Sequence, residues 1–198
     1  MENTTPIRTA LISVFHKDGL EEILSTLHAG GVRFLSTGGT QTFIESLGYP
    51  CGRVEDVTGY PSILGGRVKT LHPLIFGGIL SRRDEPTDRA EMASYNIAPI
   101  DLVIVDLYPF EQTVAQGGSH QEIIEKIDIG GISLIRATAK NYKDVAIVPS
   151  KAEYPLLLEW LKEQGARTTE EQRKLLATRA FGVSSRYDSA IHQWFTNN

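Results

Sequence analysis

Residues 9–48 read TALISVFHKDGLEEILSTLHAGGVRFLSTGGTQTFIESLG, and this stretch decides the fold class. The apolar run at 9–14 predicts a buried strand, and the apolar residues within 20–27 recur at the three- and four-residue steps of a helix. A second strand is expected at 32–36 and a second helix at 41–47. Strands that alternate with helices in this way predict a parallel sheet with helices on its faces.

Elements outside this stretch favour the same class. Asp18 and Ser119 are each followed three residues later by a glutamate, which predicts a capping box at the start of a helix. Further strands are expected at 74–80, 101–105 and 145–148, and further helices at 90–95, 119–126, 155–164 and 170–195. We therefore predict an α/β domain over 1–150 and a helical extension over 151–198, packed on that domain or on a second subunit.

Composition restricts the function. A chain of 198 residues with 41% hydrophobic and 22% charged residues is typical of a soluble globular protein. The net charge of −4 argues against general nucleic-acid binding, which needs a basic face. No apolar run approaches the roughly 18–20 residues that span a bilayer, and the N-terminus lacks the pattern of a secretory signal. The single cysteine, Cys51, fits a reducing compartment, so we expect a cytoplasmic protein.

The segment 65–73, GGRVKTLHP, is the first candidate for ligand binding. Arg67 and Lys69 are two residues apart and point the same way in an extended chain, and Thr70 adds a hydroxyl donor. The two glycines allow the backbone to approach a ligand closely. A guanidinium and an ammonium could therefore reach one anion. A solvated basic loop is the alternative.

Two loops that follow predicted strands could complete an anion site. Ligands of open parallel sheets bind beyond the carboxyl ends of the strands. Lys17 follows the first strand, and Thr37-Gly38-Gly39-Thr40 follows the second and leads into a helix, whose free N–H groups favour anions. A simple tight turn is the alternative for the glycine loop. Together with segment 65–73, the two loops indicate a phosphorylated ligand.

Three further residues could carry chemistry. Tyr108 follows the strand at 101–105, where its hydroxyl could donate to a substrate oxygen or pack under the sheet edge. Asp128 could accept a ligand N–H or only cap a helix. Lys140 lies between small residues, where partial desolvation would suit it to proton transfer, or it is an exposed lysine at a helix end. Twelve helical residues span about 18 Å, so Asp128 and Lys140 share a site only if the chain bends or the ligand is long.

These segments together resemble the inosine monophosphate (IMP) cyclohydrolase domain of the bifunctional AICAR transformylase/IMP cyclohydrolase family. The resemblance spans nearly the whole chain, and its most specific parts are 64–73 and 127–131. The matching segments are 11–14, 17–20, 36–40, 64–73, 106–110, 127–131, 139–141 and 187–191. The resemblance implies a methylglyoxal-synthase-like α/β fold with a central, mostly parallel sheet flanked by helices and a C-terminal helical extension.

The resemblance also implies an activity. The family closes 5-formamidoimidazole-4-carboxamide ribotide (FAICAR) to IMP with loss of water, as a homodimer and without metal or cofactor. The catalytic group implied by position is Lys69, Tyr108, Asp128 and Lys140. The implied substrate-binding residues are Ser13, Lys17, Thr37, Gly38, Gly39, Thr40, Arg67, Thr70, Asp106, Ile129 and Gly130. The five histidines show no spacing typical of a zinc site, which agrees with the absence of a metal.

The chain departs from the family pattern in two ways. Many family members carry Asn where this chain has Asp106, and an acid there could accept from a ribose hydroxyl but would repel a phosphate. The transformylase region has no counterpart in these 198 residues, so we expect no folate-dependent formyl transfer. Two alternatives have the same fold. A nucleotide-sensing regulatory module, as in carbamoyl phosphate synthetase, would need the phosphate loops without the catalytic group, and a methylglyoxal synthase would not need segment 127–131.

Overall fold

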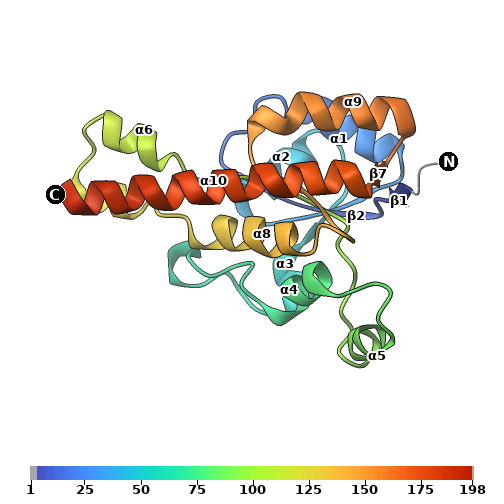
Figure 1. Ribbon diagram of the computed structural model, residues 1–198. Helices are drawn as coiled ribbons and strands as arrows, with labels where there is room; N and C mark the ends of the chain where they lie inside the picture. Colours follow the sequence, from blue (N-terminus) through green and yellow to red (C-terminus); the bar gives the residue numbers. More distant parts are fainter. Residues whose placement is uncertain (1–3, 198) are drawn as a thin grey trace.

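A five-stranded parallel sheet forms the centre of the molecule (Figure 1). The structure, a computed structural model, describes residues 4–197. The strands lie in the order β4-β3-β2-β5-β6, and every neighbouring pair is parallel. Their bounds are β2 Thr9–Val14, β3 Arg33–Ser36, β4 Cys51–Arg53, β5 Leu102–Asp106 and β6 Ala146–Val148. A separate antiparallel pair joins β1 (Thr4–Pro6) to β7 (Arg167–Thr169). The predicted α/β class is confirmed.

Helices cover the sheet and continue past one end of it (Figure 1). The helix α1 (Leu20–Ala29) packs on α9 (Tyr154–Gln164), while α8 (Ile129–Lys140) packs on β5 and β6. The long helix α10 (Glu170–Asn197) runs along α8 and β6. The other helical segments are α2 Gly38–Ser46, α3 Val54–Thr58, η1 Leu64–Gly66, α4 Pro73–Leu80, α5 Pro86–Ser94, α6 Phe110–Ala115, α7 His120–Ile124 and η2 Lys151–Glu153.

The main core lies between the sheet and these helices. Residues 102–105 of β5 are fully buried, as expected for a parallel strand with both faces covered. Leu157 of α9 and Leu176 of α10 belong to the same core as the strands. Whether 151–198 is a unit of its own therefore stays a prediction.

A second, smaller hydrophobic cluster joins α6, α7 and the last turns of α10. Its buried members are Phe110, Ile123, Tyr187 and Trp194, and we call it the C-terminal cluster. The rings of Phe110 and Trp194 meet edge to face with centroids 6.1 Å apart, an arrangement that aromatic quadrupoles favour. Figure 1 shows this end of α10 running beyond the sheet and beside α6. The C-terminal cluster is thus distinct from the main core, and Leu107 and Ile132 pack against both.

The predicted strand at 74–80 is wrong, because this segment is the helix α4. Pro73 occupies the first turn, where a missing N–H has no cost, and the side chain of His72 accepts a first-turn N–H at 3.2 Å. The glycines inside the segment serve close packing. A Cβ at Gly78 would lie 2.5 Å from the carbonyl oxygen of Ala98.

One of the two predicted capping boxes is wrong and the other is confirmed. The helix α1 is preceded by Gly19 in the left-handed region at φ 79°, without a side-chain cap, and Asp18 instead pairs with Lys151 at 2.9 Å. At α7, the hydroxyl of Ser119 accepts the N–H of Glu122 at 3.3 Å, and Glu122 accepts the N–H of Ser119 at 2.8 Å. Gly19 therefore stands at the start of α1 where Asp18 is predicted, and the exposed Asp18 side chain pairs with Lys151.

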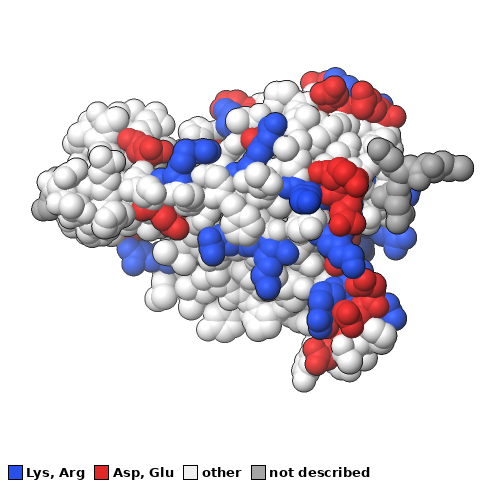
Figure 2. Space-filling model, viewed as in Figure 1, with Lys and Arg blue, Asp and Glu red and all other residues white. Residues whose placement is uncertain are grey.

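Most of the other predicted elements are present. The strands at 9–14, 32–36, 101–105 and 145–148 and the helices at 20–27, 41–47, 119–126, 155–164 and 170–195 correspond to elements of the structure within a few residues. On the face shown in Figure 2, basic and acidic side chains lie in small groups of both signs. Within 4–197, no helix is both long and apolar enough to cross a membrane.

Candidate active site

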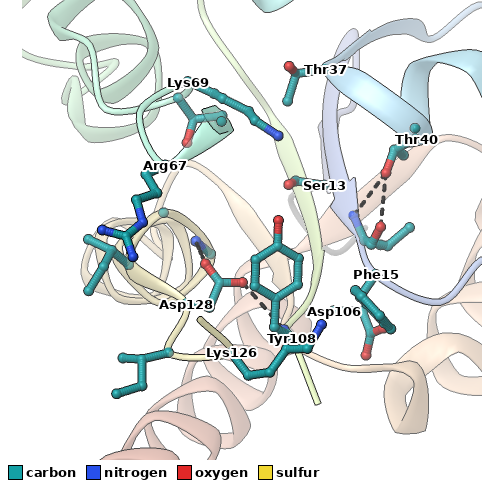
Figure 3. A pocket seen from close by; sticks show the side chains of 18 of the residues that line it. Ser13, Phe15, Thr37, Thr40, Arg67, Lys69, Asp106, Tyr108, Lys126 and Asp128 are labelled. Atoms are coloured by element: carbon teal, nitrogen blue, oxygen red, sulfur yellow. Dashed lines mark hydrogen bonds between the residues drawn. The ribbon is translucent and has the colours of Figure 1, made fainter. Parts of the chain in front are cut away.

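A cavity of about 740 Å³ opens at the carboxyl ends of β2, β3 and β5 (Figure 3). Its size suits a small-molecule ligand, and its position is the one expected for a parallel sheet. The loop after η1, the residues that follow α7 and the first turn of α8 close it. Its lining includes Ser13, Phe15, Lys17, Thr37, Gly39, Thr40, Gly66, Arg67, Lys69, Thr70, Asp106, Tyr108, Glu125, Lys126, Asp128, Ile129, Gly130 and Gly131.

One side of the cavity, which we call the strand wall, consists of Ser13, Lys17, Thr37 and Thr40 after β2 and β3. The hydroxyl of Thr40 donates to the carbonyl of Val14 at 3.0 Å and accepts the N–H of Val14 at 3.3 Å. These bonds tie the first turn of α2 to the end of β2. The free N–H groups of that turn suit an anion.

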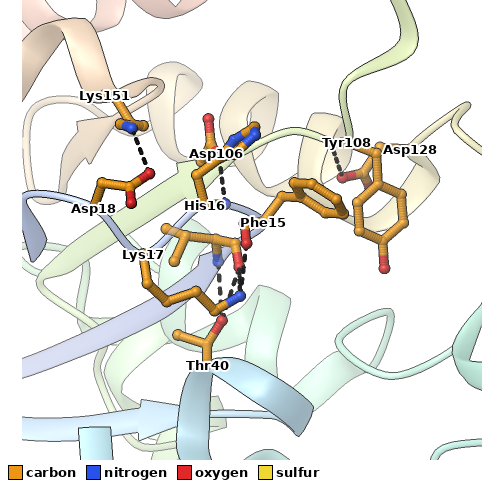
Figure 4. A network of polar contacts seen from close by, with 10 residues as sticks. Phe15, His16, Lys17, Asp18, Thr40, Asp106, Tyr108, Asp128 and Lys151 are labelled. Carbon is orange, nitrogen blue, oxygen red and sulfur yellow. Dashed lines mark hydrogen bonds and ion pairs between the residues drawn. The ribbon is translucent and has the colours of Figure 1, made fainter. Parts of the chain in front are cut away.

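Lys17 contributes to the strand wall mainly through its own loop (Figure 4). Its ammonium donates to the carbonyls of Val14 at 2.8 Å and Phe15 at 2.7 Å. Burial lowers the pKa of Lys17, and the charge of Asp106 opposes that shift. An ammonium has three protons, so one is left for a ligand.

Lys69 extends from the segment 65–73 toward the strand wall. Figure 3 shows its amine directed toward Ser13 and Thr37. Gly66 has a φ of 88°, so the backbone conformation favours glycine there, and a Cβ would lie 2.7 Å from the Cε of Lys69 and displace that side chain. Gly38 does not line the cavity, and a Cβ on it would lie 3.7 Å from the Lys69 amine.

The opposite side, which we call the helix wall, consists of Tyr108, Asp128, Ile129 and Gly130. Asp128 caps α8, because its Oδ1 accepts the N–H of Gly131 at 2.7 Å, and its Oδ2 accepts the N–H of Tyr108 at 3.4 Å. Burial raises the pKa of Asp128, although these N–H groups act in the opposite direction. The carboxylate thus both caps the helix and faces the cavity.

Aromatic side chains border the helix wall. Burial, and next the charge of Asp128, raise the pKa of Tyr108, so its phenol stays protonated and can donate. The rings of Tyr108 and Phe15 meet edge to face at 5.5 Å, and the Lys126 ammonium lies 5.3 Å from the centroid of Phe15. Ile129 exposes 57% of its surface beside them. Phe15, Tyr108 and Ile129 form an apolar rim that suits a flat ring, with the Lys126 ammonium beside it. Neither Phe15 nor Lys126 is predicted at this site from the sequence.

The hydroxyl of Tyr187 holds the helix wall from outside. It accepts the N–H of Asp128 at 2.7 Å and donates to the carbonyl of Lys126 at 2.9 Å. Burial raises the pKa of Tyr187 to about 12, so the phenol can make both bonds at neutral pH. The C-terminal cluster therefore fixes the loop that carries Asp128. No local pattern predicts this contact, because 59 residues separate the two side chains.

Two predicted site residues are arranged differently from expectation. Arg67 lines the cavity, but its guanidinium makes a two-point contact with the exposed carboxylate of Glu125. Lys140 is the exposed last residue of α8, outside the cavity. Because α8 is continuous, about 18 Å of helix separates Lys140 from Asp128. Its catalytic role stays a prediction.

The cavity therefore combines an amine, a phenol and a half-buried carboxylate with a helix N-terminus. Across residues 4–197, no three His, Cys, Asp or Glu side chains are grouped so that they could hold a metal. This donor set suits proton transfer and stabilisation of a developing oxyanion on an anionic ligand.

Comparison with known proteins identifies the family. Residues 19–133, more than half of the chain, match the MGS-like domain family. The chain belongs to the MGS-like domain family. Residues 138–198, which follow the MGS-like match, match the family described as the AICARFT/IMPCHase bienzyme. Those residues include α10 and therefore Tyr187, whose hydroxyl bonds to Asp128 of the helix wall. The side chain that supports the helix wall thus belongs to the second matched region.

Relatives of this MGS-like chain include longer proteins named "Bifunctional purine biosynthesis protein PurH". The protein from Bacteroides thetaiotaomicron is 64% identical over 195 residues, which are 98% of this chain and 38% of the relative. The protein from Rhodospirillum rubrum is 47% identical over 195 residues, which are 98% of this chain and 37% of the relative. The chain therefore spans little more than a third of the length of these relatives, and the family resemblance inferred from its motifs is confirmed.

A solved structure shares the fold over its full length. The structure titled "Crystal structure of ForH" matches with a TM-score of 0.77 and 34% identity, covering 96% of this chain and 98% of that one. The MGS-like sheet and the long C-terminal helix thus occur together in another chain of similar extent.

Proposed function

We propose that this chain is an IMP cyclohydrolase, which closes FAICAR to IMP and water in the last step of de novo purine biosynthesis. The observation that carries the proposal is the meeting of Lys69, Tyr108 and Asp128 around one cavity, beside the N-terminus of α2. The name of the PurH relatives, which refers to purine biosynthesis, supports the same pathway.

The substrate binds across the two walls. The N–H groups of α2, the hydroxyl of Ser13 and the remaining proton of Lys17 hold the 5′-phosphate, because they are donors at the positive end of a helix. Thr37 lines this pocket, but its hydroxyl donates to Glu55 at 2.8 Å. Thr70, Gly39 and Thr40 complete this pocket. Asp106, Ile129 and Gly130 line the ribose and the heterocycle.

Ring closure then needs one bond formed and one bond broken. The carboxamide nitrogen attacks the formyl carbon, and the formyl oxygen gains negative charge. The Lys69 ammonium and the Tyr108 hydroxyl donate to that oxygen. Asp128 accepts one proton from the carboxamide nitrogen, and the formamido nitrogen loses its proton as the C=N bond of the new ring forms. These two protons end on the former formyl oxygen, whose bond to carbon breaks as it leaves as water. Because burial raises its pKa, Asp128 is a stronger base than an exposed carboxylate. The reaction is intramolecular, so positioning supplies much of the rate.

Absorbance during incubation with FAICAR tests this proposal. We expect the wild type to form IMP and Lys69→Ala to be about a hundredfold slower, because one oxyanion donor is lost. Lys143→Ala is the matched control, since Lys143 pairs with Asp84 on the surface. IMP binding without turnover would support the nucleotide-sensing module instead. Conversion of dihydroxyacetone phosphate to methylglyoxal would support the synthase.

The proposal extends to Lys140, to assembly and to location. A Lys140→Ala enzyme with near-normal turnover would remove Lys140 from the catalytic group. We expect a cytoplasmic homodimer that needs no cofactor, and Leu175 and Phe181 offer exposed apolar surface on α10 for a second copy. Light scattering of the active protein checks the dimer, and a monomer mass with full turnover would contradict it.

A further inference from the structure

His16 and Asp106 form the most specific polar contact at the cavity that the proposed chemistry does not use (Figure 4). Asp106 ends β5 and lines both the main cavity and an adjoining crevice of about 390 Å³. The backbone N–H of His16 donates to Oδ2 of Asp106 at 2.8 Å, and the ring Nδ1 lies 2.8 Å from the same oxygen. Two contacts from one residue therefore fix one carboxylate oxygen.

The other oxygen of Asp106, Oδ1, has no hydrogen-bond partner among residues 4–197. Although only 14% of the Asp106 side chain is exposed, Oδ1 is not among the buried unpaired atoms, so solvent and a ligand can both reach it. A ligand hydroxyl could therefore replace water as the donor to this oxygen. The ammonium of Lys17 does not fill this role, because it donates to backbone carbonyls.

The charge of Asp106 restricts which part of a nucleotide it can meet. Its carboxylate repels a phosphate and accepts from a hydroxyl, and an acidic side chain that accepts from a ribose hydroxyl is a common way to recognise that sugar. The strand wall has the opposite character, with helix N–H groups and hydroxyl donors that suit the phosphate. The two ends of a nucleotide therefore have different partners.

We propose that His16 is a positioning residue that holds Asp106 so that its free oxygen accepts a ribose hydroxyl, which makes the site prefer ribonucleotides to deoxyribonucleotides. The inference deepens the proposed function, since it rests on a nucleotide occupying this cavity. His16 acts through Asp106 and does not touch the reacting atoms.

Calorimetric binding of IMP, 2′-deoxy-IMP and 3′-deoxy-IMP tests the inference. For the wild type we expect at least one deoxy analogue to bind about tenfold more weakly, as for a lost hydrogen bond to a charged group. In His16→Ala the backbone N–H remains, so the preference falls to about threefold. His16→Asn restores it, because the amide nitrogen can replace Nδ1.

A double-variant comparison shows whether His16 acts through Asp106. Asp106→Ala should remove the preference, and adding His16→Ala to it should change nothing further. His192→Ala, at an exposed position on α10, is the matched control and should retain the wild-type preference. An unchanged preference in His16→Ala, or no preference in the wild type, would overturn the inference.

Turnover of FAICAR by the same preparations separates this inference from the proposed function. Turnover without a ribose preference would overturn the inference and leave the cyclohydrolase assignment intact. A ribose preference that depends on His16 in a protein without turnover would overturn the cyclohydrolase assignment and support the inference. A wild type that does not bind IMP at all would overturn both.

Discussion

The strand wall and the helix wall face the same cavity but are held in different ways. Thr40 on the strand wall bonds to Val14 at the end of β2, so that wall is continuous with the main core. Asp128 on the helix wall is held by Tyr187, which belongs to the C-terminal cluster. We therefore expect the strand wall to be as stable as the sheet, and the helix wall, which also depends on the smaller cluster, to open locally more often.

The largest expected effect is loss of the carboxylate charge on the helix wall. Asp128→Asn should lower FAICAR turnover about a hundredfold or more, because it removes the proposed base. Stability should not fall at neutral pH, since Asn caps helices as well as Asp and removes a half-buried charge. The absorbance assay with FAICAR measures turnover, and thermal unfolding measures stability. A variant that keeps full turnover would contradict the role of Asp128.

The pH dependence of the same variant has a definite sign. Burial raises the pKa of Asp128 above its ordinary value of 3.8, so the folded state binds the proton more tightly than the unfolded state. The resulting stabilisation is complete below the ordinary pKa and is lost as the pH rises through the folded pKa. Wild type should therefore lose stability relative to Asp128→Asn over that window. If the difference in unfolding free energy between wild type and Asp128→Asn stayed constant with pH, this account would be contradicted.

The next effect separates the two walls by dynamics. Trp194→Ala removes a buried ring from the C-terminal cluster, and such truncations cost about 3–5 kcal/mol in well-packed cores. We expect faster amide hydrogen exchange over 110–128 and unchanged exchange in β2 and β5. Turnover should fall about tenfold, which corresponds to about 1.4 kcal/mol of activation free energy. Tyr95→Ala, at an exposed aromatic residue at the end of α5, is the control. Equal acceleration in the sheet would show that the walls are not independent.

A matched pair of hydroxyl deletions sharpens the comparison with smaller effects. Tyr187→Phe leaves the N–H of Asp128 and the carbonyl of Lys126 without a partner. Thr40→Val removes the acceptor of the Val14 N–H and one of two donors to the Val14 carbonyl, which keeps the Lys17 ammonium. Each should cost about 1–3 kcal/mol. Thermal unfolding should register the loss at Thr40 fully, whereas hydrogen exchange should confine the loss at Tyr187 to the helix wall. If Tyr187→Phe and Thr40→Val lowered the thermal unfolding midpoint equally, and hydrogen exchange at the helix wall did not become faster in Tyr187→Phe, the distinction between the walls would be contradicted.

The smallest effect concerns the exposed ion pair of Arg67 and Glu125. Exposed pairs contribute at most about 1 kcal/mol, so Glu125→Gln should leave stability unchanged. The freed guanidinium should tighten IMP binding about twofold to threefold, and salt should weaken the gain. Asp84→Asn, which breaks the surface pair with Lys143, is the control. Weaker IMP binding in Glu125→Gln would show that the pair itself shapes the site.

The strand wall was largely predictable from sequence, and the helix wall only in part. The strands at 9–14 and 32–36 and the loop at 37–40 carry their information locally, in apolar runs and glycines. The cap at Asp128 was also a local signal. Its support by Tyr187 and the pairing of Arg67 with Glu125 join residues 59 and 58 positions apart, which periodicity and capping patterns do not report.

The error at α4 has a different cause. Its apolar residues predict a strand that is broken at Gly77-Gly78, although glycine is unfavourable inside helices and strands alike. In the fold, Gly77 and Gly78 lie against Ile97 and Ala98, so the close packing of the helix outweighs its propensity. A single sequence shows the propensity but not the neighbour.

The dependence of Asp128 on Tyr187 also sets an order in time. During synthesis the N-terminal strands emerge first, and the contacts that join distant parts of a chain form last. The strand wall leaves the ribosome first, but β2 lies between β3 and β5 and shares its core with α9 and α10, so this wall is completed only with the sheet. The helix wall also needs Tyr187 of α10, so we expect the part of the cavity assigned to the proposed ring closure to be completed last.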